Sequence, residues 1–182
     1  QRMALGEADV DFCVQSCCKP INYALALEEH GQDKVHQHVG REPSGRGFNE
    51  LTLNHNGRPH NPMINAGAIV ATSLVDGDSG NAKLERILQK FAKFAGGELE
   101  VDQAIYHSEK TTGHRNRAIA HLLRNYEILE GDPEEPLDAY FRQCSIMVNA
   151  RDLALMGATL ANDGVNPITG VRALASDKVP MV

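Results

Sequence analysis

The sequence predicts a mainly helical fold with one or two short strands near its start. Apolar residues recur at helical spacing in several segments, and Ser, Asn, Pro and Gly stand where those segments begin and end. Hydrophobic residues make up 42% and charged residues 23% of the 182 residues, which is ordinary globular composition. We therefore expect a packed core rather than a disordered or fibrous chain.

Charge and cysteine content narrow the classes of protein further. The formal net charge is −6 and is spread along the chain, and no apolar run approaches the roughly 20 residues of a membrane span. Membrane insertion and broad nucleic-acid binding are therefore disfavoured. The four cysteines, Cys13, Cys17, Cys18 and Cys144, form no CxxC motif. They suit neither a zinc cluster nor a disulfide framework, and predict reduced thiols in a cytosolic or organelle-matrix setting.

The first elements follow from local signals. Residues 1–11 carry short, mixed patterns compatible with one strand and a turn. A helix is then predicted to begin with Ser16 as its N-cap and Pro20 in its first turn, and to end before Gly31. Residues 41–59 are rich in Gly, Pro, Ser and Asn, and such long connections are more often functional than idle.

A second helix is predicted over residues 63–75. Asn61 supplies its cap and Pro62 a favoured first helical residue. The segment is apolar nearly all round, so it fits a fully buried helix, with a buried strand as the alternative that periodicity cannot separate.

Four more helices are predicted from apolar periodicity in the second half of the chain. The first is amphipathic and ends at Gly96-Gly97, and the last ends before Gly164. Their approximate ranges are 84–95, 119–126, 137–144 and 149–162.

Ser16 and Lys19 form an SxxK pair. Three residues apart on a helix, the two side chains share one face, so the lysine amine can act as base for the serine hydroxyl. A helix N-terminus and an apolar pocket both favour the neutral amine that this role needs. About one SxxK is also expected by chance in a chain of this length, and a capping Ser followed by a surface Lys has the same pattern.

Three further polar residues are candidates for ligand contacts. Asn65 lies within an apolar helix, where an unpaired amide costs roughly 1–3 kcal/mol, so it needs either a backbone partner or a ligand. Glu109 and Asn116 are seven residues apart. If the segment is helical, the two side chains lie two turns apart, and if it forms a loop, they lie on opposed walls. The simpler interpretation is that both are solvent-exposed polar residues without a ligand.

Metal and cofactor sites are not predicted. His36 and His38 point apart on a helix, and His55 and His60 lie in a loop without a nearby cysteine or acidic pattern. The chain has neither GxxxxGK[ST] nor GxGxxG. We therefore expect no metal and no cofactor.

Six stretches of the chain, taken together, closely resemble the catalytic domain of the serine-dependent glutaminases. The similarity covers nearly the whole chain and is weaker over 76–106 and 125–136. The most specific parts are EPSG, HNPMINAGAI and NPITG. The stretches are FCVQSCCKPINYALAL, HVGREPSGRGFNEL, RPHNPMINAGAIVATSLV, SEKTTGHRNRAIA, LDAYFRQCSI and ATLANDGVNPITGVRAL.

This resemblance implies an α+β fold like that of β-lactamases and DD-peptidases. Residues 1–182 would form a partial catalytic domain, made mainly of the helical subdomain and the nucleophile helix, with much of the antiparallel sheet outside the chain. The implied reaction is hydrolysis of L-glutamine to L-glutamate and ammonia, with Ser16 as nucleophile and Lys19 as base.

The resemblance also implies substrate-binding residues and partners. The matching substrate positions, besides Ser16, are Asn65, Glu109, Asn116 and Tyr140. A carboxylate suits the α-ammonium of glutamine, and amide or phenol donors suit its α-carboxylate. The family further implies a homo-oligomer, located in the cytoplasm or, with an upstream targeting segment, in the mitochondrial matrix.

The resemblance also implies that the active site of this chain is truncated. The family has a tyrosine upstream of position 1, and a catalytic tyrosine, a second oxyanion donor and a glycine-rich strand downstream of position 182. A chain cut at both ends would have an incomplete pocket and little or no activity.

Two alternatives stand beside the glutaminase interpretation. One is another SxxK acyl-serine hydrolase, of the β-lactamase or DD-peptidase kind, acting on a lactam or peptide. The other is a non-catalytic helical module in which Ser16 is only a helix cap.

Overall fold

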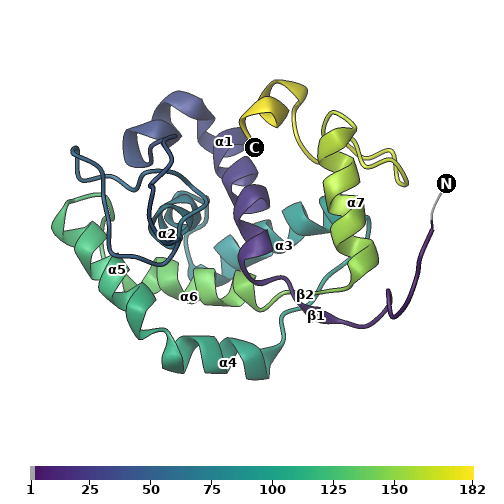
Figure 1. Ribbon diagram of the computed structural model, residues 1–182, viewed down its shortest axis with the longest axis horizontal. Coiled ribbons are helices and arrows are strands. Elements are labelled where there is room, and N and C mark those ends of the chain that lie inside the picture. Colours follow the sequence, from purple (N-terminus) through teal and green to yellow (C-terminus); the bar gives the residue numbers. More distant parts are fainter. Residues whose placement is uncertain (1–2) are drawn as a thin grey trace.

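The computed structural model describes residues 3–182 and is mainly helical (Figure 1). Helix α1 runs through the middle of the molecule and packs against α2 and α3, while α6 contacts α2, α3, α4 and α5. The helices are α1 (Cys18–His38), α2 (Asn65–Ser73), α3 (Gly80–Ala95), α4 (Gln103–Thr112), α5 (His114–Asn125), α6 (Glu134–Cys144) and α7 (Ala150–Ala161).

The start of α1 differs from the prediction. Ser16 is not an N-cap, since it lies in a short 3-10 helix, Gln15–Cys17, that leads directly into α1. The Cys18 N–H donates to the backbone carbonyls of Gln15 and Ser16, so backbone oxygens, and not the serine hydroxyl, accept the hydrogen bond at the start of the helix. The predicted break at Gly31 is confirmed by non-helical dihedrals there (φ 74°, ψ 162°), after which the helix resumes to His38.

Helix α2 is the buried helix that the sequence predicts, and the strand alternative is wrong. Residues 66–72 are all buried. The helix begins at Asn65 rather than at Pro62, because the Asn61 side chain closes a turn ahead of it by accepting hydrogen bonds from the Met63 and Ile64 N–H groups at 3.0 and 3.2 Å.

The end of α3 at Gly96 and the end of α7 before Gly164 confirm the predicted stop signals, and the structure adds side-chain caps at the start of both helices. Ser79 caps α3 by accepting a hydrogen bond from Ala82 N–H, and Gly96 ends it in a left-handed conformation with φ 78°. Asn149 and Asp152 form a capping box at the start of α7.

Helix α4 and the two short strands differ from the sequence predictions. Helix α4, capped by the Asp102 side chain, has no counterpart among them. The strands are β1 (Phe12–Cys13) and β2 (Met147–Val148), which pair antiparallel. The strand expected within residues 1–11 is absent from residues 3–11, and the rest of that expectation falls on residues 1–2, outside the described chain. Two-residue strands are too short to show periodicity.

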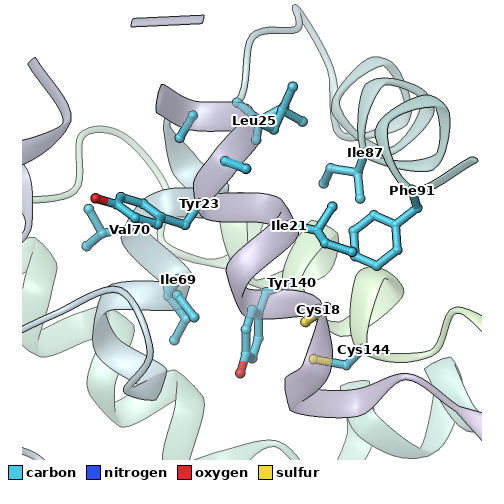
Figure 2. Close-up of a cluster of buried hydrophobic side chains, with 14 of the residues drawn as sticks. Cys18, Ile21, Tyr23, Leu25, Ile69, Val70, Ile87, Phe91, Tyr140 and Cys144 are labelled. Atoms are coloured by element: carbon cyan, nitrogen blue, oxygen red, sulfur yellow. The ribbon is translucent and has the colours of Figure 1, made fainter. Parts of the chain in front are cut away.

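The core lies where α1, α2, α3 and α6 meet. Figure 2 shows Ile21 of α1 beside Ile87 and Phe91 of α3, with Tyr140 and Cys144 of α6 near Cys18 at the start of α1. The start of α1 at Cys18 is therefore set in a packed interior. Among residues 3–182, no helix combines the length and the apolar character needed to cross a membrane.

Gly67 allows α2 to approach the turn at Asn61. A Cβ built at Gly67 would lie 1.9 Å from the Asn61 carbonyl oxygen. We expect Gly67→Ala to lower the free energy of unfolding by roughly 1–3 kcal/mol, because backbone must shift. Urea denaturation would measure this. Gly157→Ala on α7 is the matched control, since its Cβ would meet nothing within 4 Å. Helix propensity should make that variant more stable by about 0.5–1 kcal/mol, so equal effects of the two substitutions would contradict the argument.

Candidate functional site

A chain of polar side chains joins three helices. Lys19 of α1 donates a hydrogen bond from Nζ to Asn65 Oδ1 at 2.8 Å. Asn65, the first residue of α2, donates from Nδ2 to Asn116 Oδ1 of α5 at 3.0 Å. The structure thus brings together three of the six site residues predicted from the sequence, and it gives the Asn65 amide a side-chain partner on each side.

Lys19 is the buried member of this chain. Only 4% of its surface is exposed. Burial lowers the pKa of Lys19 below its ordinary value, although the neighbouring Cys18 and Cys144 oppose this effect. A larger share of the amine is therefore neutral at a given pH than in an exposed lysine, and a neutral amine can accept a proton.

The connection 41–59 reaches this site. The Phe48 ring centroid lies 5.4 Å from Lys19 Nζ, and the Phe48 carbonyl accepts a hydrogen bond from the Asn65 N–H at 2.8 Å. Phe48 itself is 60% exposed. The sequence marked this loop as functional without selecting Phe48.

Ser16 lies one turn before Lys19 and is exposed. Within residues 3–182 its hydroxyl has no hydrogen-bond partner, and the Lys19 amine is bonded to Asn65 instead. The preceding residue, Gln15, has φ 47°, a left-handed conformation that costs a non-glycine residue roughly 1–2 kcal/mol. The backbone therefore turns sharply where it presents the serine.

Glu109 faces this turn from α4. Gln15 donates a hydrogen bond from Nε2 to Glu109 Oε1 at 3.2 Å. Sequence reasoning missed Gln15, although its position next to Ser16 could have singled it out. Glu109 lies on α4 and Asn116 on α5, and the two helices are separated at Gly113. Both predicted arrangements, one continuous helix and a loop, are therefore wrong.

Gly113 makes this separation possible. A Cβ built there would lie 2.4 Å from the Phe141 ring of α6 and 2.7 Å from the Glu109 carbonyl oxygen. Helices α4 and α5 can therefore both pack against α6 from the two sides of one glycine.

Tyr140 is the most buried aromatic candidate, at 3% exposure. It lies beside Cys18 and Cys144, with its hydroxyl pointing away from the apolar side chains of the cluster (Figure 2). Burial raises the pKa of Tyr140 well above its ordinary value, so the phenol stays protonated and can donate a hydrogen bond. In the described chain Tyr140 has no hydrogen bond to Lys19, Asn65 or Asn116, but its helix contacts the Gln15–Cys17 turn.

One other group of side chains has the composition of a metal site. Ligand atoms of Glu29, His30 and Asp76 lie within 4.8 Å of one another. They are already engaged, because Arg86 and the Asp76 N–H bind the Glu29 carboxylate and His30 Nε2 bonds the Leu74 carbonyl. We interpret this cluster as a tie between α1, α3 and the connection that joins α2 to α3.

The arrangement has the parts of an amide hydrolase. It presents an exposed serine hydroxyl one helical turn from a buried amine, with amide groups bonded to that amine and a carboxylate bonded to the neighbouring Gln15. Such a set can attack an amide carbonyl and recognise a substrate that carries both charges.

Comparisons with known proteins agree with this chemistry. The family model described as glutaminase matches residues 1–182. The chain is 49% identical over 173 residues to a glutaminase of Trichormus variabilis, covering 94% of this chain and 52% of that protein. It is 44% identical over 183 residues to the mitochondrial liver isoform of glutaminase from Rattus norvegicus, covering 98% of this chain and 30% of that protein.

Solved structures show the same fold. A Bacillus glutaminase crystallised with 4.3 M NaCl superposes with a TM-score of 0.92 at 36% identity, covering 97% of this chain and 60% of that one. Mglu in its glutamate form gives 0.91 at 42% identity, covering 97% and 41%. The chain spans about half or less of the length of the two curated relatives compared above. The mainly helical part of an α+β, β-lactamase-like architecture is thereby confirmed.

The state of Lys19 can be tested through Asn65. Replacing Asn65 by Asp puts a carboxylate against the amine, and an opposite charge at this distance favours the ammonium form. We expect Asn65→Asp to raise the pKa of Lys19 by about 1–3 pH units. The 13Cε chemical shifts of labelled lysines, followed against pH, measure it directly.

The control is Asn125→Asp at the exposed end of α5, which should leave Lys19 unchanged. A wild-type Lys19 that titrates at or above the ordinary 10.5 would contradict the assigned environment.

Proposed function

Because the chain belongs to the glutaminase family, we propose that it hydrolyses L-glutamine to L-glutamate and ammonia through an acyl-enzyme on Ser16. Residues 1–182 form part of the catalytic domain in this proposal. The observation that carries it is the buried Lys19 amine, held by Asn65 one turn from an exposed serine hydroxyl. The same family match favours glutamine over the lactam or peptide substrates of other SxxK hydrolases.

The proton and bond changes balance without a cofactor. Ser16 Oγ attacks the carbon of the side-chain amide while its proton passes to the Lys19 amine. The protonated lysine then gives that proton to the leaving nitrogen, the C–N bond breaks, and ammonia departs from a glutamyl ester. Water hydrolyses the ester with Lys19 again as base, and the Ser16 N–H is proposed as an oxyanion donor.

Substrate recognition is proposed for the four residues around this pair. Glu109 is suited to the α-ammonium group, since it offers a carboxylate at the opening. The Asn116 amide is oriented by Asn65, whose donated bond occupies its Oδ1. Among residues 3–182 the Asn116 Nδ2 has no partner, so this group is free to donate to the α-carboxylate. Asn65 and the protonated Tyr140 phenol are proposed as further donors to the same carboxylate.

The family membership extends the proposal to assembly and location. We infer a homo-oligomer that acts in the cytoplasm, or in the mitochondrial matrix where a targeting segment precedes the chain.

Ser16→Ala separates a nucleophile from a helix cap. We expect it to abolish ammonia release by the protein at full length, with a change in melting temperature of less than about 2 °C, because the hydroxyl makes no bond in the described fold. Ammonia release coupled to glutamate dehydrogenase and differential scanning calorimetry measure the two effects.

The matched control is Ser79→Ala, which removes a serine that does cap a helix. It should lower the free energy of unfolding by about 0.5–2 kcal/mol and keep glutamine turnover. If Ser16→Ala retained turnover, or destabilised the protein as Ser79→Ala does, the nucleophile assignment would be wrong.

A further inference from the structure

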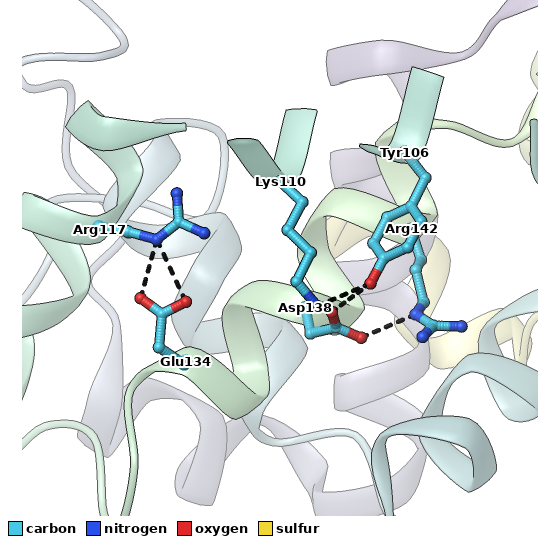
Figure 3. Close-up of polar contacts among 6 residues, drawn as sticks. All are labelled: Tyr106, Lys110, Arg117, Glu134, Asp138 and Arg142. Carbon is cyan, nitrogen blue, oxygen red and sulfur yellow. Dashed lines mark hydrogen bonds and ion pairs between the residues drawn. The ribbon is translucent and has the colours of Figure 1, made fainter. Parts of the chain in front are cut away.

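A second polar cluster connects α4 to α6 at some distance from Ser16. The carboxylate of Asp138 accepts hydrogen bonds from Tyr106 and Lys110 of α4 and from Arg142 of its own helix (Figure 3). The Lys110 Nζ and Arg142 Nε atoms lie 2.6 and 2.7 Å from its oxygens. The Arg142 guanidinium also lies 4.7 Å from the centre of the Tyr106 ring. Three side chains therefore converge on one acidic group.

From this arrangement we infer that Asp138 is a positioning residue, which holds the Glu109 end of α4 in place for recognition of the substrate α-ammonium group. The inference rests on the proposed function, because it gives Glu109 that substrate role. Lys110, the direct neighbour of Glu109, is one of the groups bonded to Asp138.

Helix α4 depends on such polar contacts because it has little apolar anchoring. All ten of its residues are described and none is buried. Its start is tied down by the Val101–Ile146 bridge and by the Asp102 N–H, which donates to the Ser145 carbonyl at 2.9 Å. Glu109 lies seven residues beyond Asp102. The Asp138 cluster is the tie at that end of the helix.

The Asp138 carboxylate is suited to this task. Its side chain is 23% exposed. Burial alone would raise the pKa of Asp138, but hydrogen bonds from Lys110, Tyr106 and Arg142 outweigh it and lower the pKa below its ordinary value. The group is therefore ionised at neutral pH, where charge-assisted hydrogen bonds to two cations are strongest.

A second ion pair on α6 provides a contrast. Glu134 accepts two hydrogen bonds from Arg117 Nε of α5, at 3.0 and 3.2 Å (Figure 3). Helix α5, however, also buries Ile119, Ala120 and Leu123 in the core. Loss of Glu134 should leave α5 in place, whereas loss of Asp138 should free α4.

The test compares Asp138→Asn and Asp138→Ala with the matched control Glu134→Gln in the protein at full length. We expect both Asp138 variants to raise KM for L-glutamine about tenfold or more while kcat stays within about threefold, because the serine and lysine are untouched. Glu134→Gln should change neither value by more than about twofold. A fall in kcat and melting temperature with an unchanged KM would mean that Asp138 is merely structural and would overturn the inference.

A double-mutant cycle tests the route through Glu109. If Asp138 acts by placing Glu109, then Asp138→Asn should have no further effect on KM once Glu109 is replaced by Gln. Additive effects of the two substitutions would overturn the inference.

Hydrogen exchange gives a readout that does not depend on glutamine turnover. Amides of residues 106–112 should exchange at least about tenfold faster in Asp138→Ala than in wild type or Glu134→Gln. If the proposed activity failed while this acceleration appeared, the positioning of α4 would stand and only the substrate role of Glu109 would fall. Unchanged exchange would overturn the positioning itself.

Discussion

The burial of the Lys19 amine is the constraint on which the rest of the site depends. A buried amine must be hydrogen-bonded, and the partner here is a side-chain amide from another helix, Asn65. That amide needs a partner of its own and finds it in Asn116 on a third helix. One desolvated amine therefore requires α1, α2 and α5 to meet with polar atoms about 3 Å apart. Such a chain of bonds stabilises the fold only when it is complete.

Close packing of α2 makes this meeting possible. The three residues after Asn65 are Ala, Gly and Ala, and Gly67 lets the helix lie against the turn at Asn61. The Asn61 side chain holds that turn ready for the first residue of the helix. The same short segment therefore satisfies its own backbone, fills the core and directs one amide at Lys19. A larger side chain at position 67 would move the helix away from the turn and the amide away from the amine.

Local signals predicted the parts of the fold that local physics determines. The helix end at Gly96 and the break at Gly31 depend only on neighbouring residues, and the sequence predicts both. The caps at Ser79 and Asn149 are equally local, although the prediction did not include them. Helix α4 escaped prediction because none of its residues is fully buried and only Ile105 and Tyr106 give it a short, partly buried apolar side, which is too little periodicity to detect. The two-residue strands are defined only by pairing across the chain.

The candidate site divides in the same way. The spacing of Ser16 and Lys19 suggests their cooperation, but the contact between Lys19 and Asn65 spans 46 positions and no local pattern indicates it. Residue chemistry marked Asn65, Glu109 and Asn116 only as candidates, and the resemblance to a known family added Tyr140 and a common substrate role for all four. It did not supply Gln15 or the reason that Glu109 can face it, because both depend on where α4 lies.

The site combines two kinds of support, and the difference follows from the charges they handle. In the proposed mechanism Lys19 acts as a base, which burial favours, and its helix is packed into the core. The same proposal gives Glu109 the task of attracting an ammonium group, and deep burial disfavours the charged form of any carboxylate. Apolar anchoring of α4 would draw Glu109 inward. Anchoring through a partly exposed acid with three polar partners leaves Glu109 half-buried at the surface, with its carboxylate bonded to Gln15 in the turn that presents the serine. Helix α4 is thus held by polar contacts and α1 by apolar packing, and in each case the kind of contact favours the charge state that the side chain needs in the proposed mechanism.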